Sequence, residues 1–158
     1  PEAILPDSSC ARLRSLRNPE KKMSKSDQDT LSCIYISDSP DVIEKKVKSS
    51  VTDTIKEVYY DPDNRLGVSN LITVYSELSG ETPEGLSVYL QNNNVNKVRG
   101  KQLLTELLIE KLQPIQSELS RLLSDKHYID SVVNEGRDRA SDIAANTMTE
   151  VRSLVGLR

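Results

Sequence analysis

The strongest constraint on the fold is a long run of leucine and isoleucine spaced three or four residues apart, between about residues 97 and 123. This period places the apolar side chains on one side of an α-helix and polar residues on the other. Pro114 lies within the run and predicts a kink, because proline removes a backbone donor and crowds the preceding turn. The repeating positions are Leu104, Leu108, Leu112, Ile115, Leu119 and Leu122.

A shorter helix is predicted to begin at Ser39 and Pro40. A serine hydroxyl caps the first turn of a helix, and proline suits the first helical position because its missing N–H has no partner there. Apolar residues at spacing four predict the buried side, while the charged residues face water or an RNA partner. The apolar positions are Ile43, Val47, Val51 and Ile55, and the charged ones are Glu44, Lys45, Lys46 and Lys48.

Capping and turn residues divide the middle of the chain. A polar cluster at residues 61–67 predicts a joint, and a helix over 68–78 is predicted to end at Gly80. Thr82 and Pro83 repeat the pattern of a cap followed by proline, so a third short helix is predicted there.

Two further helices are predicted after the long one. The first ends near Gly136, and the last, over residues 140–155, carries an apolar stripe that we expect to be buried. Residues 11–16 and 34–36 are rich in residues that favour short extended segments. Helices therefore dominate the prediction.

Composition limits the class of protein. The net charge of -3 argues against a generally basic nucleic-acid-binding protein, so RNA contact would need local patches. No apolar run has the length of a membrane span. Cys10 and Cys33 lack metal-ligand spacing and are interpreted as free thiols, and the single His127 is too little for a cluster, so no metal site is predicted. The motifs GxxxxGKS/T, GxGxxG, HExxH and GxSxG do not occur in the sequence.

One stretch is a candidate catalytic element, residues 21–27, which we call the lysine loop. It places three lysines and two serines within seven residues, without β-branched or aromatic side chains, which predicts a mobile loop of concentrated positive charge. Ammonium groups are compact charges with three rotatable donors, so they suit a polyphosphate. One lysine about 4 Å from a phosphate charge is worth roughly 4 kcal/mol at an effective dielectric near 20, before desolvation. A solvated basic loop is the alternative.

The order of residues in the lysine loop resembles a known signature. Lys22-Met23-Ser24-Lys25-Ser26 matches the KMSKS motif of class I aminoacyl-tRNA synthetases. The flanking segments resemble the bacterial and mitochondrial tryptophanyl-tRNA synthetases, and the resemblance covers nearly the whole chain. The matching segments are residues 11–16, 18–19, 51–53, 67–71, 114–115, 136–140 and 155–157.

The resemblance implies a ligase that condenses tryptophan with ATP and then transfers the aminoacyl group to tRNA(Trp). Lys22 and Lys25 would be the catalytic residues, holding the β- and γ-phosphates while Mg²⁺ shares the charge. Leu13 matches the position at which the family contacts adenine through its backbone. The ATP-binding residues implied in this way are Leu13, Lys22, Met23, Ser24, Lys25 and Ser26.

The same resemblance implies a mainly α fold in two parts. Residues 1–42 would be the C-terminal remnant of a Rossmann-like α/β catalytic domain, and residues 43–158 an α-helical anticodon-binding bundle. Cations and free amide groups at the start of the long helix can both meet tRNA phosphate, although a solvated helix start is an equal alternative. The candidate tRNA-binding residues are Lys97, Arg99 and Lys101.

Nothing in the sequence resembles the HIGH motif or the tryptophan pocket of the family, and the chain does not begin with methionine. We therefore expect a fragment that is inactive alone. Tryptophan would bind through the missing half, and the full-length enzyme would be a homodimer without a membrane partner. The expected location is the mitochondrial matrix, with the bacterial cytoplasm as the alternative. The rival interpretations are a fragment of a tyrosyl-tRNA synthetase and a non-catalytic helical RNA-binding module that keeps the loop as a relic.

Overall fold

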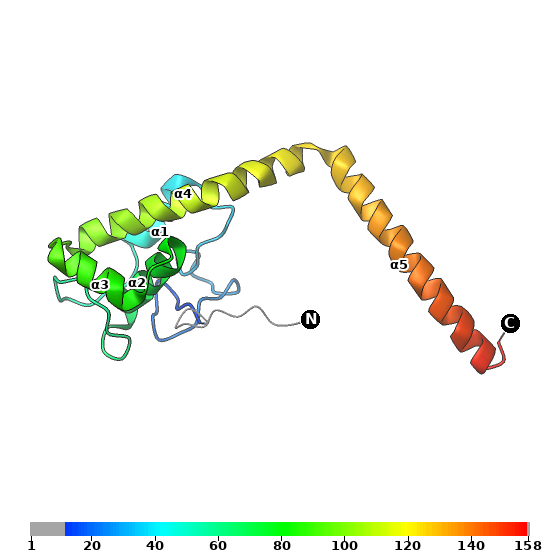
Figure 1. The fold of residues 1–158 in the computed structure, drawn as a ribbon, viewed down its shortest axis with the longest axis horizontal. Helices are drawn as coiled ribbons and strands as arrows, with labels where there is room; N and C mark the ends of the chain where they lie inside the picture. Colours follow the sequence, from blue (N-terminus) through cyan, green and yellow to red (C-terminus); the bar gives the residue numbers. More distant parts are fainter. Residues whose placement is uncertain (1–11, 158) are drawn as a thin grey trace. The chain divides into compact units, whose positions relative to one another are not determined.

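Helices form most of the computed structural model, which describes residues 12–157 (Figure 1). Among these residues no β-strand forms, and the segments predicted to be extended contribute only one isolated bridge, between Arg14 and Lys22. The prediction of a mainly α fold is confirmed. The helices are α1 (Pro40–Lys48), α2 (Leu66–Ser79), α3 (Pro83–Asn92), α4 (Lys97–Ser124) and α5 (Lys126–Leu154).

Two compact units divide the chain within α4. Unit 1 ends at Ile115 and contains α1, α2, α3 and the first part of α4, whereas unit 2 comprises residues 116–158, the end of α4 and α5. The division directly follows Pro114, which lies inside α4. Proline has no N–H to donate to the preceding turn, so it weakens the helix where the two units meet in sequence.

The predicted starts of α1 and α3 and the predicted end of α2 are present. The Ser39 hydroxyl accepts a hydrogen bond from the Val42 N–H at the start of α1, and Thr82 does the same for the Gly85 N–H at the start of α3. Gly80 ends α2 with φ of 79°, a left-handed conformation that costs glycine little. Local sequence therefore determines these three helix ends.

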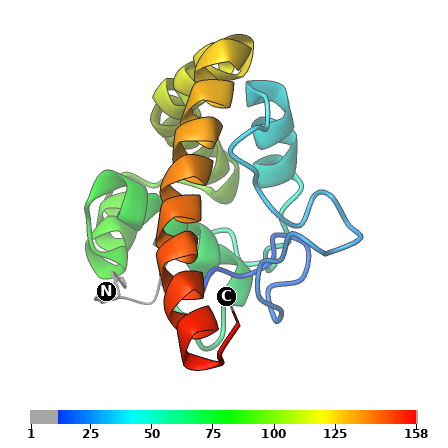
Figure 2. The same cartoon turned by 90° about the vertical axis from the view of Figure 1, so that its right-hand side faces the viewer.

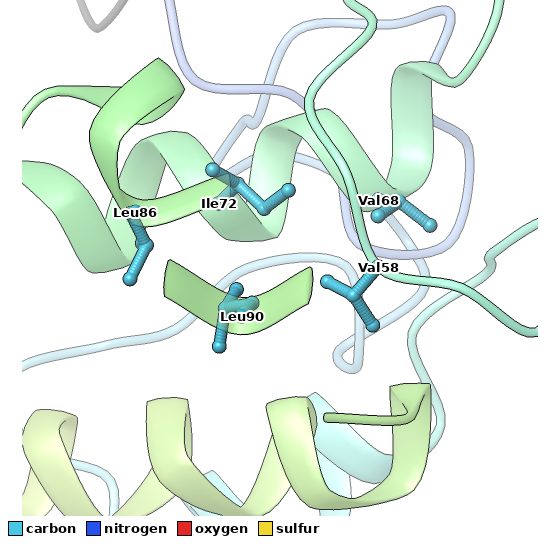
Figure 3. Packing of buried hydrophobic residues seen from close by; sticks show 5 residues of the cluster. All are labelled: Val58, Val68, Ile72, Leu86 and Leu90. Atoms are coloured by element: carbon cyan, nitrogen blue, oxygen red, sulfur yellow. The ribbon is translucent and has the colours of Figure 1, made fainter. Parts of the chain in front are cut away.

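Two apolar clusters form the core of unit 1. The first joins α2, α3 and the segment before α2, and Figure 3 shows its buried side chains converging from these three elements. The second joins α1 to α4. The first cluster contains Val58, Val68, Ile72, Leu86 and Leu90, and the second contains Ile43, Val47, Leu104 and Leu108.

The prediction for α1 was wrong in two respects, the exposure of Lys46 and the length of the helix. Lys46 is only 3% exposed, and its ammonium group pairs with Asp38 over 2.5 Å. The helix ends at Lys48, so Val51 and Ile55 lie beyond it and are exposed. An apolar spacing of four thus continued past the residue at which the backbone leaves the helix.

Unit 2 differs from its prediction in two ways. Gly136 does not end a helix, since α5 runs without a break from Lys126 to Leu154. The apolar stripe over residues 140–155 is exposed, and α5 has no buried residue. Unit 2 consists of α5 and the end of α4, which is too little material to enclose a core. None of the helices in the described part of the chain combines the length and apolarity needed to cross a bilayer.

Candidate functional site

The lysine loop is carried by a short stem, in which residues 13–15 pair with residues 21–23. The Met23 N–H donates to the Leu13 carbonyl over 2.9 Å, and the Ser15 N–H donates to the Lys21 carbonyl over 3.0 Å. Arg14 therefore lies opposite Lys22 in antiparallel pairing. Figure 2 shows the surrounding residues 12–39, in blue, as loops without helix.

Hydroxyl groups shape the tip of the lysine loop. The Ser24 and Ser26 hydroxyl oxygens are 3.0 Å apart, and the Asp27 N–H approaches the Ser24 carbonyl at 3.4 Å. The Tyr35 hydroxyl donates a long hydrogen bond of 3.4 Å to the Lys25 carbonyl. These contacts fold the backbone at the tip and use no lysine ammonium group.

The two lysines that were predicted to be catalytic are exposed. Lys22 lies at the end of the stem and Lys25 at the tip. Within residues 12–157 no carboxylate forms an ion pair with either ammonium group. Both ammonium groups are therefore available to an anionic ligand. Binding would not have to break an internal ion pair first, so it carries no energetic cost of that kind.

Three connections hold the stem to the rest of unit 1. The Leu16 carbonyl accepts a hydrogen bond of 2.7 Å from the Val51 N–H, and the Leu16 N–H donates to the Ser32 carbonyl over 3.0 Å. The third connection is the side chain of Asn70, in α2, which hydrogen-bonds the backbone of Arg14. The stem is thus fixed to unit 1 from several directions, and these three connections do not involve the tip of the loop.

A charged network lies behind the tip. Asp38 accepts from the Lys46 ammonium and, over 2.8 Å, from the Tyr35 N–H. The same ammonium group lies 4.5 Å from the centre of the Tyr35 ring, a cation–π distance. Sequence reasoning missed this network, although a lysine on the buried side of a helix with an aspartate just before the helix cap is a recognisable signal.

The thiol of Cys33 lies near this network. Burial raises its pKa, and the positive charges of Lys46 and Lys25 oppose the increase. The prediction of a free thiol is confirmed for Cys33, whereas Cys10 lies outside the described residues. A buried thiol with a raised pKa is a poor nucleophile at neutral pH, so Cys33 is not a candidate for catalysis.

The three candidate tRNA-binding cations line one cleft of about 660 Å³ between α1 and α4, with Glu44 and Lys48 among its other walls. Of the three side chains, only that of Arg99 is exposed. Arg99 pairs with Glu106 over 3.1 Å, and both side chains are more than half exposed.

The other two cations have partners inside unit 1. Lys97 donates to the Asp53 carbonyl and lies 3.8 Å from the Asp53 carboxylate. Lys101 donates to the Lys48 carbonyl over 3.1 Å and to the Ser50 carbonyl over 2.7 Å, at the C-terminal end of α1. Burial lowers the pKa of Lys101. The structure therefore brings the predicted cations together and gives two of them structural contacts that the sequence did not indicate.

Comparisons with known proteins cover both the loop and the helices. The family model for class I tRNA synthetases (W and Y) matches residues 2–113. A tryptophan–tRNA ligase of Bacillus anthracis is 36% identical over 147 residues, which are 93% of this chain and 44% of that protein. A tryptophan–tRNA ligase of Listeria monocytogenes is 36% identical over 159 residues, covering 99% of this chain and 46% of the relative.

A solved structure has the same fold over most of the chain. It is the tryptophanyl-tRNA synthetase from Mycoplasma pneumoniae, with a TM-score of 0.62 and 26% identity, covering 73% of this chain and 36% of that one. The chain thus spans less than half the length of the curated relatives that it matches. Because the family model matches most of its residues, the chain belongs to the class I tRNA synthetases (W and Y).

Proposed function

We propose that this chain is the C-terminal part of a tryptophan–tRNA ligase that activates tryptophan with ATP and transfers it to tRNA(Trp). The observation that carries the proposal is the pair of exposed ammonium groups on Lys22 and Lys25, free of carboxylate partners within the described residues and mounted on a fixed stem. The similarity to bacterial tryptophan–tRNA ligases supports the choice of amino acid.

In this proposal the lysine loop acts on the triphosphate of ATP. Lys22 and Lys25 hold the β- and γ-phosphates, and Mg²⁺ bound to ATP shares the charge. The Leu13 backbone contacts adenine, while Met23, Ser24 and Ser26 shape the site. Phosphate displacement depends mainly on positioning and on stabilising charge, so lysines that approach the phosphates most closely in the transition state lower the barrier.

The division of labour follows from the same proposal. Residues 1–42 form the end of a Rossmann-like catalytic domain, and residues 43–158 form the anticodon-binding domain. Packing of Ile43 and Val47 on Leu104 supports placing the part of α1 from residue 43 onward with the helical domain. Of the three cations, Arg99 is the main candidate for contact with tRNA, because the ammonium groups of Lys97 and Lys101 are already hydrogen-bonded to backbone carbonyls.

The remaining parts of the enzyme lie outside this chain. Tryptophan binds through the rest of the full-length protein, which acts as a homodimer, and the chain alone forms no adenylate. We further propose the mitochondrial matrix as the location. A fluorescent fusion of the full-length protein that stays in the cytosol of a eukaryotic cell would contradict that location.

The proposal is tested by replacing Lys25 with Ala in the full-length protein. We expect tryptophan-dependent ATP–pyrophosphate exchange to fall by about 10²-fold, the usual loss when one stabilising donor is removed from an active site. Stability in urea should stay unchanged, because the side chain is exposed. Lys111→Ala, at an exposed position of α4, is the matched control and should retain full exchange.

Two results distinguish the rival functions in the same assay. No tryptophan-dependent exchange in the unmodified full-length protein would support a helical RNA-binding module with a relic loop. Exchange that depends on tyrosine and not on tryptophan would assign the chain to the tyrosine enzymes of the family. Either result overturns the proposed function.

A further inference from the structure

Asn70 is bound to the stem of the lysine loop by two hydrogen bonds. Its Oδ1 accepts from the Arg14 N–H over 2.9 Å, and its Nδ2 donates to the Arg14 carbonyl over 3.0 Å. Asn70 is 7% exposed and lies 56 residues from Arg14 along the chain. A side-chain amide used in this way replaces a neighbouring strand, because it satisfies both backbone groups of one residue.

The pairing pattern of the stem explains why Arg14 needs such a partner. Its neighbours Leu13 and Ser15 use their backbone groups to pair with Met23 and Lys21. In antiparallel pairing the backbone groups of successive residues point to opposite edges, so those of Arg14 point away from Lys22. Asn70 meets them at this outer edge. The segment of the stem that contains Arg14 is thus bound to the lysine loop on one edge and to α2 on the other.

We propose that Asn70 is a positioning residue for the lysine loop, an inference that rests on the proposed function. By binding both backbone groups of Arg14, it sets where the stem begins relative to α2. The stem in turn sets where Lys22 and Lys25 can reach a triphosphate. Because Asn70 is buried, water cannot easily take over when the amide is lost, and two backbone groups are left without partners.

The first experiment uses the chain itself and needs no catalytic assay. It tests the clamp, meaning the two hydrogen bonds between the Asn70 side chain and the Arg14 backbone. In Asn70→Leu we expect hydrogen exchange of the Arg14 and Met23 amides to accelerate by at least about tenfold, the effect of losing one or two buried hydrogen bonds. Amides in α4 should keep their rates. Unchanged rates at Arg14 and Met23, or equal acceleration throughout unit 1, would overturn the clamp.

Ser87→Ala is the matched control for this measurement. Ser87 is 8% exposed and its hydroxyl accepts from the Tyr60 N–H over 2.9 Å, so it also joins a helix to a distant backbone segment. Its loss should accelerate exchange at Tyr60 and leave Arg14 and Met23 unaffected. Acceleration at Met23 in this variant would mean that any buried anchor of unit 1 affects the loop, and would count against a specific role for Asn70.

The second experiment uses the full-length enzyme. In Asn70→Leu we expect kcat for tryptophan-dependent pyrophosphate exchange to fall by about tenfold with the KM for tryptophan unchanged. Asn70→Asp should lose activity at neutral pH, where a carboxylate opposes the Arg14 carbonyl. It should recover relative to the unmodified enzyme as the pH is lowered, because a protonated carboxyl can again donate. A constant ratio at all pH values would contradict a role for the donated bond.

A double-mutant cycle distinguishes a positioning role of Asn70 from a general loss of folded structure. If Asn70 acts through the lysine loop, Asn70→Leu should cost little more once Lys25 is already Ala, whereas independent effects would multiply. Multiplying losses would overturn the proposal. If the unmodified enzyme shows no ATP–pyrophosphate exchange, the proposed function fails, and the catalytic role of Asn70 fails with it. The hydrogen-exchange rates of the Arg14 and Met23 amides still decide whether the clamp exists.

Discussion

Arg65 and Asp53 form a two-pronged ion pair, with Nε to Oδ2 at 2.8 Å and Nη2 to Oδ1 at 2.9 Å. The Arg65 side chain is 2% exposed, and its guanidinium lies 4.1 Å from the centre of the Tyr59 ring. Nη2 also donates to the Glu57 carbonyl over 3.0 Å, while Lys97 approaches the same carboxylate from the start of α4. One aspartate thus joins the segment after α1 to the starts of α2 and α4.

Replacing Asp53 with Ala should strongly destabilise unit 1. The change leaves the buried Arg65 charge without its partner, which typically costs about 3 kcal/mol or more of the free energy of unfolding. Urea unfolding followed by tyrosine fluorescence measures this, since five of the six tyrosines lie in unit 1 and the chain has no tryptophan. Glu106→Ala removes the exposed partner of Arg99 and should cost less than about 1 kcal/mol. Equal costs for the two variants would contradict the role of Asp53.

The same pair predicts a dependence of stability on pH. Hydrogen bonds from Arg65 hold the pKa of Asp53 below its usual value, and the Ile55 N–H and the charges of Arg65 and Lys97 add to this. The unfolded chain therefore takes up a proton at a higher pH than the folded chain, so the stabilisation is present above the ordinary aspartate pKa of about 3.9 and is lost as the pH falls below it.

We expect the unfolding free energy to fall more steeply in acid for the unmodified chain than for Asp53→Asn, which has no proton to take up at this position. Urea unfolding at a series of pH values from neutral to about pH 3 gives both slopes. Parallel curves for the two proteins would show that another carboxylate dominates the acid response.

Local signals predicted the starts of α1 and α3 and the end of α2 because each depends on residues close in sequence. Ser39 caps α1 through Val42, three residues later, and Gly80 ends α2 through its own backbone angles. Lys46 escaped prediction because an amphipathic pattern counts lysine as polar whatever its partner. Gly136 was read as a stop, although a helix tolerates glycine at a cost of about 1 kcal/mol when its flanking residues favour it.

The candidate site was predictable to the extent that it is contiguous. The residues of the lysine loop follow one another, so their charges and hydroxyl groups are visible in the sequence. Asn70 lies 56 residues from Arg14, and no local pattern connects the two. Similarly, the sequence placed Lys97 and Lys101 at a helix start, but their carbonyl partners come from residues more than forty positions earlier.

Lys101 and Arg99 should separate stability from RNA binding. Lys101→Met keeps an apolar side chain of similar length but removes the donors to the end of α1, so we expect a loss of about 1.5–3 kcal/mol in the free energy of unfolding. Arg99→Met should change stability by less than about 1 kcal/mol. In the full-length protein it should weaken tRNA binding and reduce the salt dependence of that binding. Filter binding at several salt concentrations gives both quantities.

Two results would contradict the expectations for Lys101→Met and Arg99→Met. If Lys101→Met unfolds at the same urea concentration as the unmodified chain, its contacts with the Lys48 and Ser50 carbonyls contribute nothing to stability. If Arg99→Met binds tRNA with unchanged affinity and salt slope, the exposed cation of the cleft does not contact phosphate.

Gly67 should be the glycine of unit 1 least tolerant of a side chain. A Cβ at this position would lie 2.3 Å from the Val51 carbonyl oxygen and 3.2 Å from its carbon, and the backbone of Val51 is itself bound to Leu16. Gly67→Ala must therefore displace the start of α2 or the segment that carries the stem, at a cost of about 1–3 kcal/mol. Gly136→Ala, where nothing lies within 4 Å, should instead strengthen α5 by about 1 kcal/mol. Urea unfolding followed by tyrosine fluorescence reports the first change and circular dichroism the second. An unchanged urea midpoint for Gly67→Ala would mean that α2 and Val51 do not approach this closely in solution.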